Sequence, residues 1–299
     1  MSLWHENSAR YGLEGVRYTL LALACLLLVA LGVGLQGQGR FDNLFLSQAG
    51  STRLATRQSE PPFRLPDRKG PADPSPREEA LRRDIEAQFS KVPVFQAFFD
   101  RFRLAFPIDY DLTVQRGIAR AEAAGKVETP EQYVLDAISV LRRGRGLLAA
   151  HASDLALARL FDLQSQTMTA LAQIDPGLCV GFLYGTAATG FIAFAATHRD
   201  LVADMANAGL DAVIDGQANR VARSAPSEAD FQRIESDLTA RGLAPNEIDA
   251  LLDGRVPTPA LPDDRFCKAA LSYLDVLKGL PPGMRAAIYS LSVELMSRS

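Results

Sequence analysis

Two cysteines, Cys179 and Cys267, have the residue type and setting for a specific covalent link. Each lies on the apolar face of a predicted helix, whereas Cys25 belongs to a separate apolar segment near the start of the chain. An even pair of cysteines predicts a disulfide if the domain lies outside the reducing cytosol. The alternative is two buried free thiols, because unpaired cysteines often pack as small hydrophobic side chains.

Three arginines form the densest basic cluster of the sequence. Arg142, Arg143 and Arg145 stand together in RRGRG. Guanidinium groups bind phosphates and other anions through paired N–H donors, so these residues are candidate anion-binding groups. A solvent-exposed helix end is the interpretation we favour, because cations are favourable near a helix C-terminus.

The other reactive residue types do not identify a catalyst. His5, His151 and His198 lie far apart and belong to no Cys/His ligand cluster, so neither a metal nor a cofactor is expected. Asp109 and Asp111, in PIDYDL, could in principle act as an acid–base pair. We favour an Asp-rich turn for them, and the catalytic residues stay unassigned.

The charge distribution argues against nucleic-acid binding. The chain has 299 residues, is 47% hydrophobic and carries a net charge of −3, so it can bury a sizeable core. Residues 77–299 hold twenty-four Lys and Arg against twenty-nine Asp and Glu. Nucleic-acid binding needs a concentrated basic face, so neither DNA nor RNA is an expected partner. Only five of the basic residues are Lys, a bias that indicates a bacterial source.

A long apolar segment near the start predicts a membrane anchor. Thr19–Leu35 is uncharged and contains ten Leu or Val residues. As a helix it spans about 26 Å, which is enough to cross a bilayer. We predict a transmembrane helix over residues 18–36 after a short cytoplasmic segment, 1–17. A cleaved signal peptide would have a shorter apolar run and a clearer cleavage site, and a lipidated Cys25 would be followed by polar residues.

The region after the anchor predicts a tether. Residues 37–75 are rich in Pro and Gly and lack apolar periodicity, which is typical of a disordered linker. Basic residues are nearly balanced across the anchor, so they do not choose its orientation. Because a single span followed by a long translocated domain is common, we expect an inner-membrane protein with its folded domain in the periplasm or outside.

Residues 76–299 predict an all-α domain, with a possible sub-boundary near residue 224. SPRE at Ser75 and TPEQ at Thr129 have the pattern of helix starts. Phenylalanines at spacings of three and four from Phe95 to Phe106 predict a helix face turned towards the core rather than a docking surface. No two-residue alternation indicates strands. The expected architecture is a multi-helix bundle or an irregular α-solenoid.

The glycine-rich stretch GLCVGFLYGTAATGFIAFAATH could form a second membrane span. Leu178–Thr197 is only marginally apolar and has glycines in its middle, so we expect a soluble arrangement. The pattern predicts a short helix over 176–184, a turn, and a second helix from near Phe191. Three glycines four residues apart would let a neighbouring helix approach closely. These are Gly177, Gly181 and Gly185.

These features predict a single-pass, membrane-anchored envelope protein whose helical domain is a protein-interaction or assembly module with a protein partner. One alternative is an envelope hydrolase with a carboxylate-based site. Another is a two-span transport or pore component that uses residues 178–197. Paired acidic residues along one large cleft would favour the enzyme, and a continuous exposed apolar groove would favour the interaction module.

Overall fold

The computed structural model describes residues 75–184, 188–253 and 260–298. Every regular element within these ranges is an α-helix and none is a strand, so the all-α prediction is confirmed for them. In the same ranges, no helix combines the length and apolar character that a membrane crossing requires.

The predicted amino-terminal segments fall outside the described residues. These are the cytoplasmic segment 1–17, the transmembrane helix 18–36 and the linker 37–75 except for its last residue. They remain predictions from the sequence.

The helices have the following bounds in chain order. They are α2 (Pro76–Phe89), α3 (Pro93–Ala105), α4 (Pro107–Ala124), α5 (Pro130–Ala150), α6 (Asp154–Ile174), α7 (Pro176–Tyr184), α8 (Ala188–Thr197), α9 (Arg199–Asn219), α10 (Glu228–Ala240), α11 (Pro245–Asp253), α12 (Asp263–Gly279) and α13 (Pro282–Arg298).

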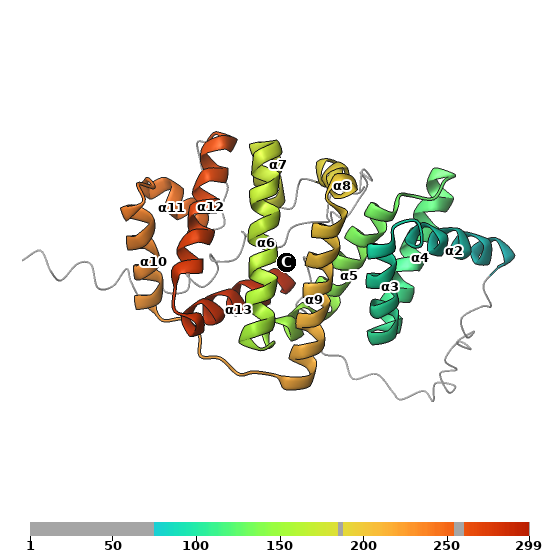
Figure 1. Cartoon of the computed structure of the whole chain (residues 1–299), viewed down its shortest axis with the longest axis horizontal. Helices are drawn as coiled ribbons and strands as arrows, with labels where there is room; N and C mark the ends of the chain where they lie inside the picture. Colours follow the sequence, from blue (N-terminus) through green and yellow to red (C-terminus); the bar gives the residue numbers. More distant parts are fainter. Residues whose placement is uncertain (1–74, 185–187, 254–259, 299) are drawn as a thin grey trace, which may run out of the picture.

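The helices are arranged along one long axis, with α2, α3 and α4 at one end and α10 and α11 at the other (Figure 1). Helix α9 packs against α3, α5 and α6, and α13 packs against α5 and α6. The last helix therefore packs against helices from the middle of the chain. In a solenoid, by contrast, each unit contacts only its neighbours in sequence.

The connection between α9 and α10, which contains residue 224, is held against the corner between α5 and α6. The Val221 N–H donates to the His151 carbonyl at 2.8 Å. The Arg223 guanidinium donates to the carbonyls of Ala150 and Ala152 and to the Asp154 carboxylate. The carbonyls of Ala150, His151 and Ala152 lie at or just after the end of α5, where a helix leaves carbonyls without a partner of its own.

Local capping explains where several helices begin. At α2 the Ser75 hydroxyl accepts from the Glu78 N–H, and the Glu78 carboxylate accepts from the Ser75 N–H, so the predicted capping box is present. At α5 the Thr129 hydroxyl accepts from the Gln132 N–H. The Gln132 side chain donates to Asp136 and does not complete a second box.

The phenylalanine stripe of α3 lies in the core, as predicted. Phe95, Phe98, Phe99 and Phe102 are all buried, and so is Phe106 directly after the helix. The Phe99 ring stacks on Phe89 of α2 and meets Tyr110 of α4 edge-on, and the Phe102 ring also meets Tyr110 edge-on. This aromatic cluster fixes the corner where α2, α3 and α4 meet.

The Asp-rich turn predicted at PIDYDL is wrong, because Asp109 and Asp111 lie within α4. Pro107 occupies the first helical position, where its missing N–H costs nothing, and an acidic residue in the first turn suits the helix dipole. Asp109 is buried and pairs with Arg145, whereas Asp111 is exposed and pairs with Arg82.

The glycine-rich stretch forms two short helices. Helix α7 covers Pro176–Tyr184, as predicted, and α8 begins at Ala188, three residues before the expected start. Residues 185–187 lie outside the described residues. The side chains of Phe182 and Phe191 are fully buried and stack on each other. This pair therefore belongs to the core of the domain.

One close approach in this region occurs at Gly190. A Cβ on Gly190 would collide with the Leu178 side chain of α7. Because the conflicting atom is the end of the flexible Leu178 side chain, a Cβ at Gly190 would require that side chain to move rather than the backbone. The sequence predicts close approach at the row of Gly177, Gly181 and Gly185, of which Gly185 lies outside the described residues. A Cβ on Gly177 would meet the carboxylates of Asp175 and of Asp263, the first residue of α12, at 3.2 Å, so a neighbouring helix does approach closely there.

Candidate functional site

A polar groove of about 490 Å³ lies where the turn between α2 and α3, the connection between α4 and α5, and the start of α9 come together. Its walls combine charged, polar and apolar side chains. The lining residues are Gln88, Lys91, Val92, Val127, Glu128, Thr129, Pro130, Glu131 and Arg199.

Helix starts position the groove. Helix α5 begins at Pro130 after the Thr129 cap, which sets Glu131 in the first turn. Helix α9 begins at Arg199, directly after His198. The His198 ring stacks on Phe194 of α8, with 4.2 Å between ring centroids. The groove is therefore built from helix ends whose directions the core fixes.

One wall carries a partly buried ion pair between α5 and α9. The Glu131 Oε1 atom accepts from the Arg199 Nε atom at 3.0 Å and lies 2.9 Å from Nη2. The Glu131 side chain is 5% exposed, whereas that of Arg199 is 48% exposed. The carboxylate is thus the buried partner, and the guanidinium stands at the rim of the groove.

The other acidic wall is held by Arg120 of α4. Its Nε atom donates to Glu128 at 2.8 Å, and its Nη2 atom donates to Asp136 of α5. The Glu128 N–H donates to the Tyr133 hydroxyl at 3.1 Å. Glu128 lines the groove, and Asp136 stands behind it. We call Arg120, Glu128 and Asp136 the shared-arginine cluster.

Burial changes the acidity of this cluster. Desolvation raises the pKa of the Asp136 carboxyl to about 6, the Arg120 guanidinium opposes the shift, and the Glu128 carboxylate adds to it. The pKa of the Tyr133 hydroxyl is raised, chiefly by burial. Asp136 is therefore a carboxylate that titrates near neutral pH.

Tyr133 joins the groove to the core. Its ring is fully buried and meets Phe89 of α2 edge-on. A Cβ on Gly117 of α4 would lie 2.8 Å from the Tyr133 ring, so α4 needs glycine there to pack on the tyrosine. The connection that carries Glu128 is thus fixed to a rigid part of the domain.

Ion pairing limits what the groove can do chemically. Both acidic residues that line it, Glu128 and Glu131, accept hydrogen bonds from arginines. A general acid or base must exchange a proton with a bound substrate, which requires direct access. Charged pairs beside apolar surface from Val92 and Val127 instead suit recognition of a polar surface that carries both signs of charge.

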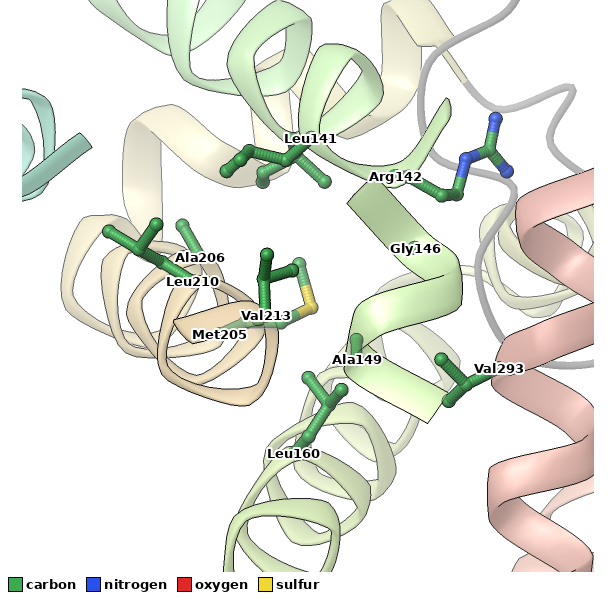
Figure 2. A pocket seen from close by; sticks show the side chains of 12 residues that line it. Leu141, Arg142, Gly146, Ala149, Leu160, Met205, Ala206, Leu210, Val213 and Val293 are labelled. Carbon is green, nitrogen blue, oxygen red and sulfur yellow. The ribbon is translucent and has the colours of Figure 1, made fainter. Parts of the chain in front are cut away.

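A second hollow is apolar and much smaller. It measures about 60 Å³ and lies among α5, α6, α9 and α13 (Figure 2). Leu141, Leu160, Met205 and Val213 contribute to its lining, and the Arg142 side chain is directed away from them. A hollow of this size holds no more than a few atoms, so it is a packing defect of the core.

A third hollow, about 280 Å³, separates the first turns of α6 and α13. Its charged residues are Asp154, which binds Arg223, and Arg285, whose guanidinium lies 5.9 Å from the centre of the Phe161 ring. Both contacts hold neighbouring segments together, because Arg223 belongs to the connection between α9 and α10 and Arg285 packs α13 on α6. We therefore place the candidate site in the polar groove.

The structure separates the three predicted anion-binding arginines. All three lie within α5, which continues to Ala150, so the predicted helix end at RRGRG is wrong. Arg142 is buried, and burial lowers its pKa. Arg143 is exposed and donates to the Ser139 hydroxyl at 2.6 Å. Arg145 binds Asp109 and lies over the Phe106 ring. The three arginine side chains therefore lie in three different environments and are not gathered around one position.

Tertiary packing explains why α5 continues past these glycines. A Cβ on Gly146 would collide with Ser297 of α13. Glycine normally weakens a helix interior by about 1 kcal/mol relative to alanine. Here the packing of α13 against α5 offsets that preference, which cannot be read from the local sequence.

Cys179 and Cys267 are joined in the structure by a disulfide between α7 and α12. Their Cα atoms are 5.8 Å apart, and both residues are buried. The bond connects residues separated by 88 positions in the sequence, across the segment that contains α8 to α11.

The two histidines among the described residues make structural contacts. His151 ends α5, and its Nδ1 atom lies 3.2 Å from the Val221 carbonyl. The His198 Nδ1 atom lies 2.9 Å from the Thr197 hydroxyl. Within the ranges that the structure describes, no three His, Cys, Asp or Glu residues are grouped as a metal site would require.

Sequence reasoning missed the residues of the groove. Arg120, Glu128 and Asp136 come from two helices and their connection, and Arg199 comes from a third helix. The Thr129 cap was the only local feature near them. Nothing in the spacing of Glu131 and Arg199 indicates that they meet.

Comparison of the chain with protein-family models, with curated proteins and with solved structures found no match.

Proposed function

We propose that this protein is a membrane-anchored envelope protein whose helical domain binds another protein through the polar groove. The observation that carries the proposal is the groove itself, about 490 Å³ in volume and lined by paired charges of both signs beside apolar side chains. Its walls are fixed by helix ends and by the buried Tyr133. A rigid polar surface of this kind binds a partner with little loss of conformational entropy.

The cellular location is supported by two independent features. The apolar segment Thr19–Leu35 predicts the anchor. The disulfide between Cys179 and Cys267 is of a kind that persists mainly in oxidising compartments. Together they favour a domain held outside the cytoplasm on the linker 37–75.

Site-specific photo-crosslinking in cells tests the binding function. A photo-reactive amino acid at Gln88 should give a defined adduct with one protein, identified by mass spectrometry. Lys91→Glu reverses a charge on the same wall and should reduce the adduct at least fivefold. Lys268→Glu, on the exposed surface of α12, is the matched control and should leave it unchanged. Equal loss in both variants, or no adduct, would contradict the proposal.

The second candidate function is an envelope hydrolase, and Asp136 is the observation that favours it. A carboxyl with a pKa of about 6 is suited to act as a general acid near neutral pH. Asp136 does not line the groove, however, and Arg120 lies between it and Glu128. We therefore expect the wild type and Asp136→Asn to have equal turnover rates with ester, glycoside, peptide and phosphate substrates. A turnover that only Asp136→Asn loses would favour the enzyme.

A further inference from the structure

The shared-arginine cluster lies directly behind a wall of the groove, so its charge acts on anything bound there. Arg120 is the single cation between two carboxylates, Glu128 and Asp136. Its side chain is 24% exposed and that of Asp136 is 15% exposed, so water screens their charges only in part. Because Glu128 lines the groove and pairs with Arg120, a change in the charge of the cluster changes the electrostatic potential at the groove surface.

The charges around the groove are balanced when every carboxylate is ionised. The carboxylates that line the groove or share a cation with its lining are Glu128, Glu131 and Asp136. The corresponding cations are Lys91, Arg120 and Arg199. Neutralising one carboxylate therefore leaves the site with one excess positive charge.

We propose that protonation of Asp136 regulates the groove, making it more attractive to acidic groups of a bound partner. This inference rests on the groove being the binding site. When Asp136 is neutral, Arg120 is balanced by Glu128 alone. The wall then repels an incoming carboxylate or phosphate less than it does when both acids are ionised.

The groups that face Asp136 support this assignment. Helix α4 contributes Arg120, the connection before α5 contributes Glu128, and α5 itself contributes Gln132 and Tyr133. Arg199 of α9 faces Glu131 instead.

The other helices that pack on α5 are α2, α8 and α13. Over the described residues, none of them forms an ion pair with Asp136. The nearby charges of α2 are paired with α4 or within α2, as in Arg77 with Glu122 and Arg82 with Glu86 and Asp111. Arg120 and Glu128 are thus the charged groups that act most directly on Asp136, whose pKa of about 6 places the change between pH 5 and 7.

The test measures the electrostatic potential in the groove directly. The full chain with Cys25→Ser is kept in a non-ionic detergent. Gln88→Cys then introduces a thiol on the groove wall. Its modification rate is measured with a negatively charged and a positively charged methanethiosulfonate reagent between pH 5 and 8. The ratio of the two rates cancels the pH dependence of the thiolate itself and reports the local potential.

We expect the ratio of negative to positive reagent to rise about threefold as the pH falls through 6, as one unit charge near the thiol would produce. With Asp136→Asn the ratio should be high at every pH, because asparagine mimics the protonated acid. Asp111→Asn, which removes an exposed acid of α4, should keep the pH dependence.

Ser236→Cys on the exposed face of α10 is the distant control and should show no threefold change. A ratio that is flat at the groove thiol, or one that changes equally in Asp136→Asn, would overturn the inference. No partner is present in this measurement. Its failure is therefore distinguishable from a failure of the crosslinking experiment.

Discussion

Cys179 of α7 and Cys267 of α12 are covalently joined, and both residues are buried within the core of the domain. The bond closes a segment that contains α8 to α11. It therefore ties the carboxy-terminal helices to α7 independently of the noncovalent packing. The bond stabilises the fold mainly by lowering the conformational entropy of the unfolded chain. Its loss should therefore lower the free energy of unfolding.

We predict that reducing this disulfide lowers the free energy of unfolding by about 2–4 kcal/mol, the range typical of bonds that close long loops. The measurement is denaturant unfolding with and without a reductant. Cys179→Ala together with Cys267→Ala is the matched control, and its stability should not respond to the reductant. A wild type equally stable in both conditions would contradict a structural role for the bond.

Alanine substitutions at two glycines of α9, Gly209 and Gly216, should change the stability in opposite directions. A Cβ on Gly209 would meet no atom within 4 Å, and this residue lines the small apolar cavity. Gly209→Ala should therefore raise the free energy of unfolding by about 0.5–1 kcal/mol through helix propensity. A Cβ on Gly216 would collide with the Leu148 carbonyl of α5.

Gly216→Ala should lower stability by about 2–3 kcal/mol, because rigid backbone must move. Thermal unfolding of both variants gives the comparison. If the two alanines changed the melting temperature in the same direction, the close packing of α5 on α9 would be wrong.

The sequence predicted elements whose cause is local and missed contacts between distant segments. The cap at Ser75 and the stripe from Phe95 to Phe102 depend on residues within one or two helical turns, and both are present. The turn expected at Asp109 is wrong although Pro107 is a local helix-start signal, whereas the pairing of Asp109 with Arg145 of another helix has no signal in the local sequence. The contacts that form the groove likewise join segments far apart in the sequence.

Glu131 meets Arg199 only because the packing of α8 and α9 on α5 fixes where α9 starts. No periodicity within either segment carries that information. The candidate site could therefore be identified only from the folded chain.

The ion pair between Glu131 and Arg199 should contribute measurably to stability. Arg199→Ala leaves a buried carboxylate without its cation, and we expect a loss of about 1–2 kcal/mol, less than for a fully buried pair because Arg199 is half exposed. Arg233→Ala removes the exposed pair with Asp237 on α10 and should cost less than about 0.5 kcal/mol. Chemical unfolding of the two variants tests this order, and equal losses would contradict it.

Asp136 should make stability fall as the pH rises from 5 to 7. Its pKa is about 6 in the folded chain, above the ordinary value of about 4, so the folded state binds more protons than the unfolded state in this window. The effect is up to about 3 kcal/mol in total, and roughly half of it falls between pH 5 and 7, because the unfolded acid is already mostly ionised at pH 5. It should be absent in Asp136→Asn.

Denaturant unfolding at pH 5, 6 and 7 measures the difference between wild type and Asp136→Asn. Carboxyls with lowered pKa values, such as Glu247 beside Arg265 and Asp215 beside the Ser153 N–H, lose their stabilising contribution only at lower pH. They therefore do not interfere in this window. A difference that stays constant from pH 5 to 7 would show that Asp136 does not titrate there.

The central claim is that the helical domain works outside the cytoplasm, and the redox state of Cys179 and Cys267 in cells tests it most directly. Cells that produce the chain with Cys25→Ser are quenched in acid, and free thiols are then labelled under denaturing conditions with a maleimide that shifts the protein on a gel. We predict no shift before reduction and a two-thiol shift after it. Deletion of residues 18–36 should retain the chain in the cytoplasm and leave both thiols free. Free thiols in the intact chain, or a disulfide that forms equally without residues 18–36, would contradict the account.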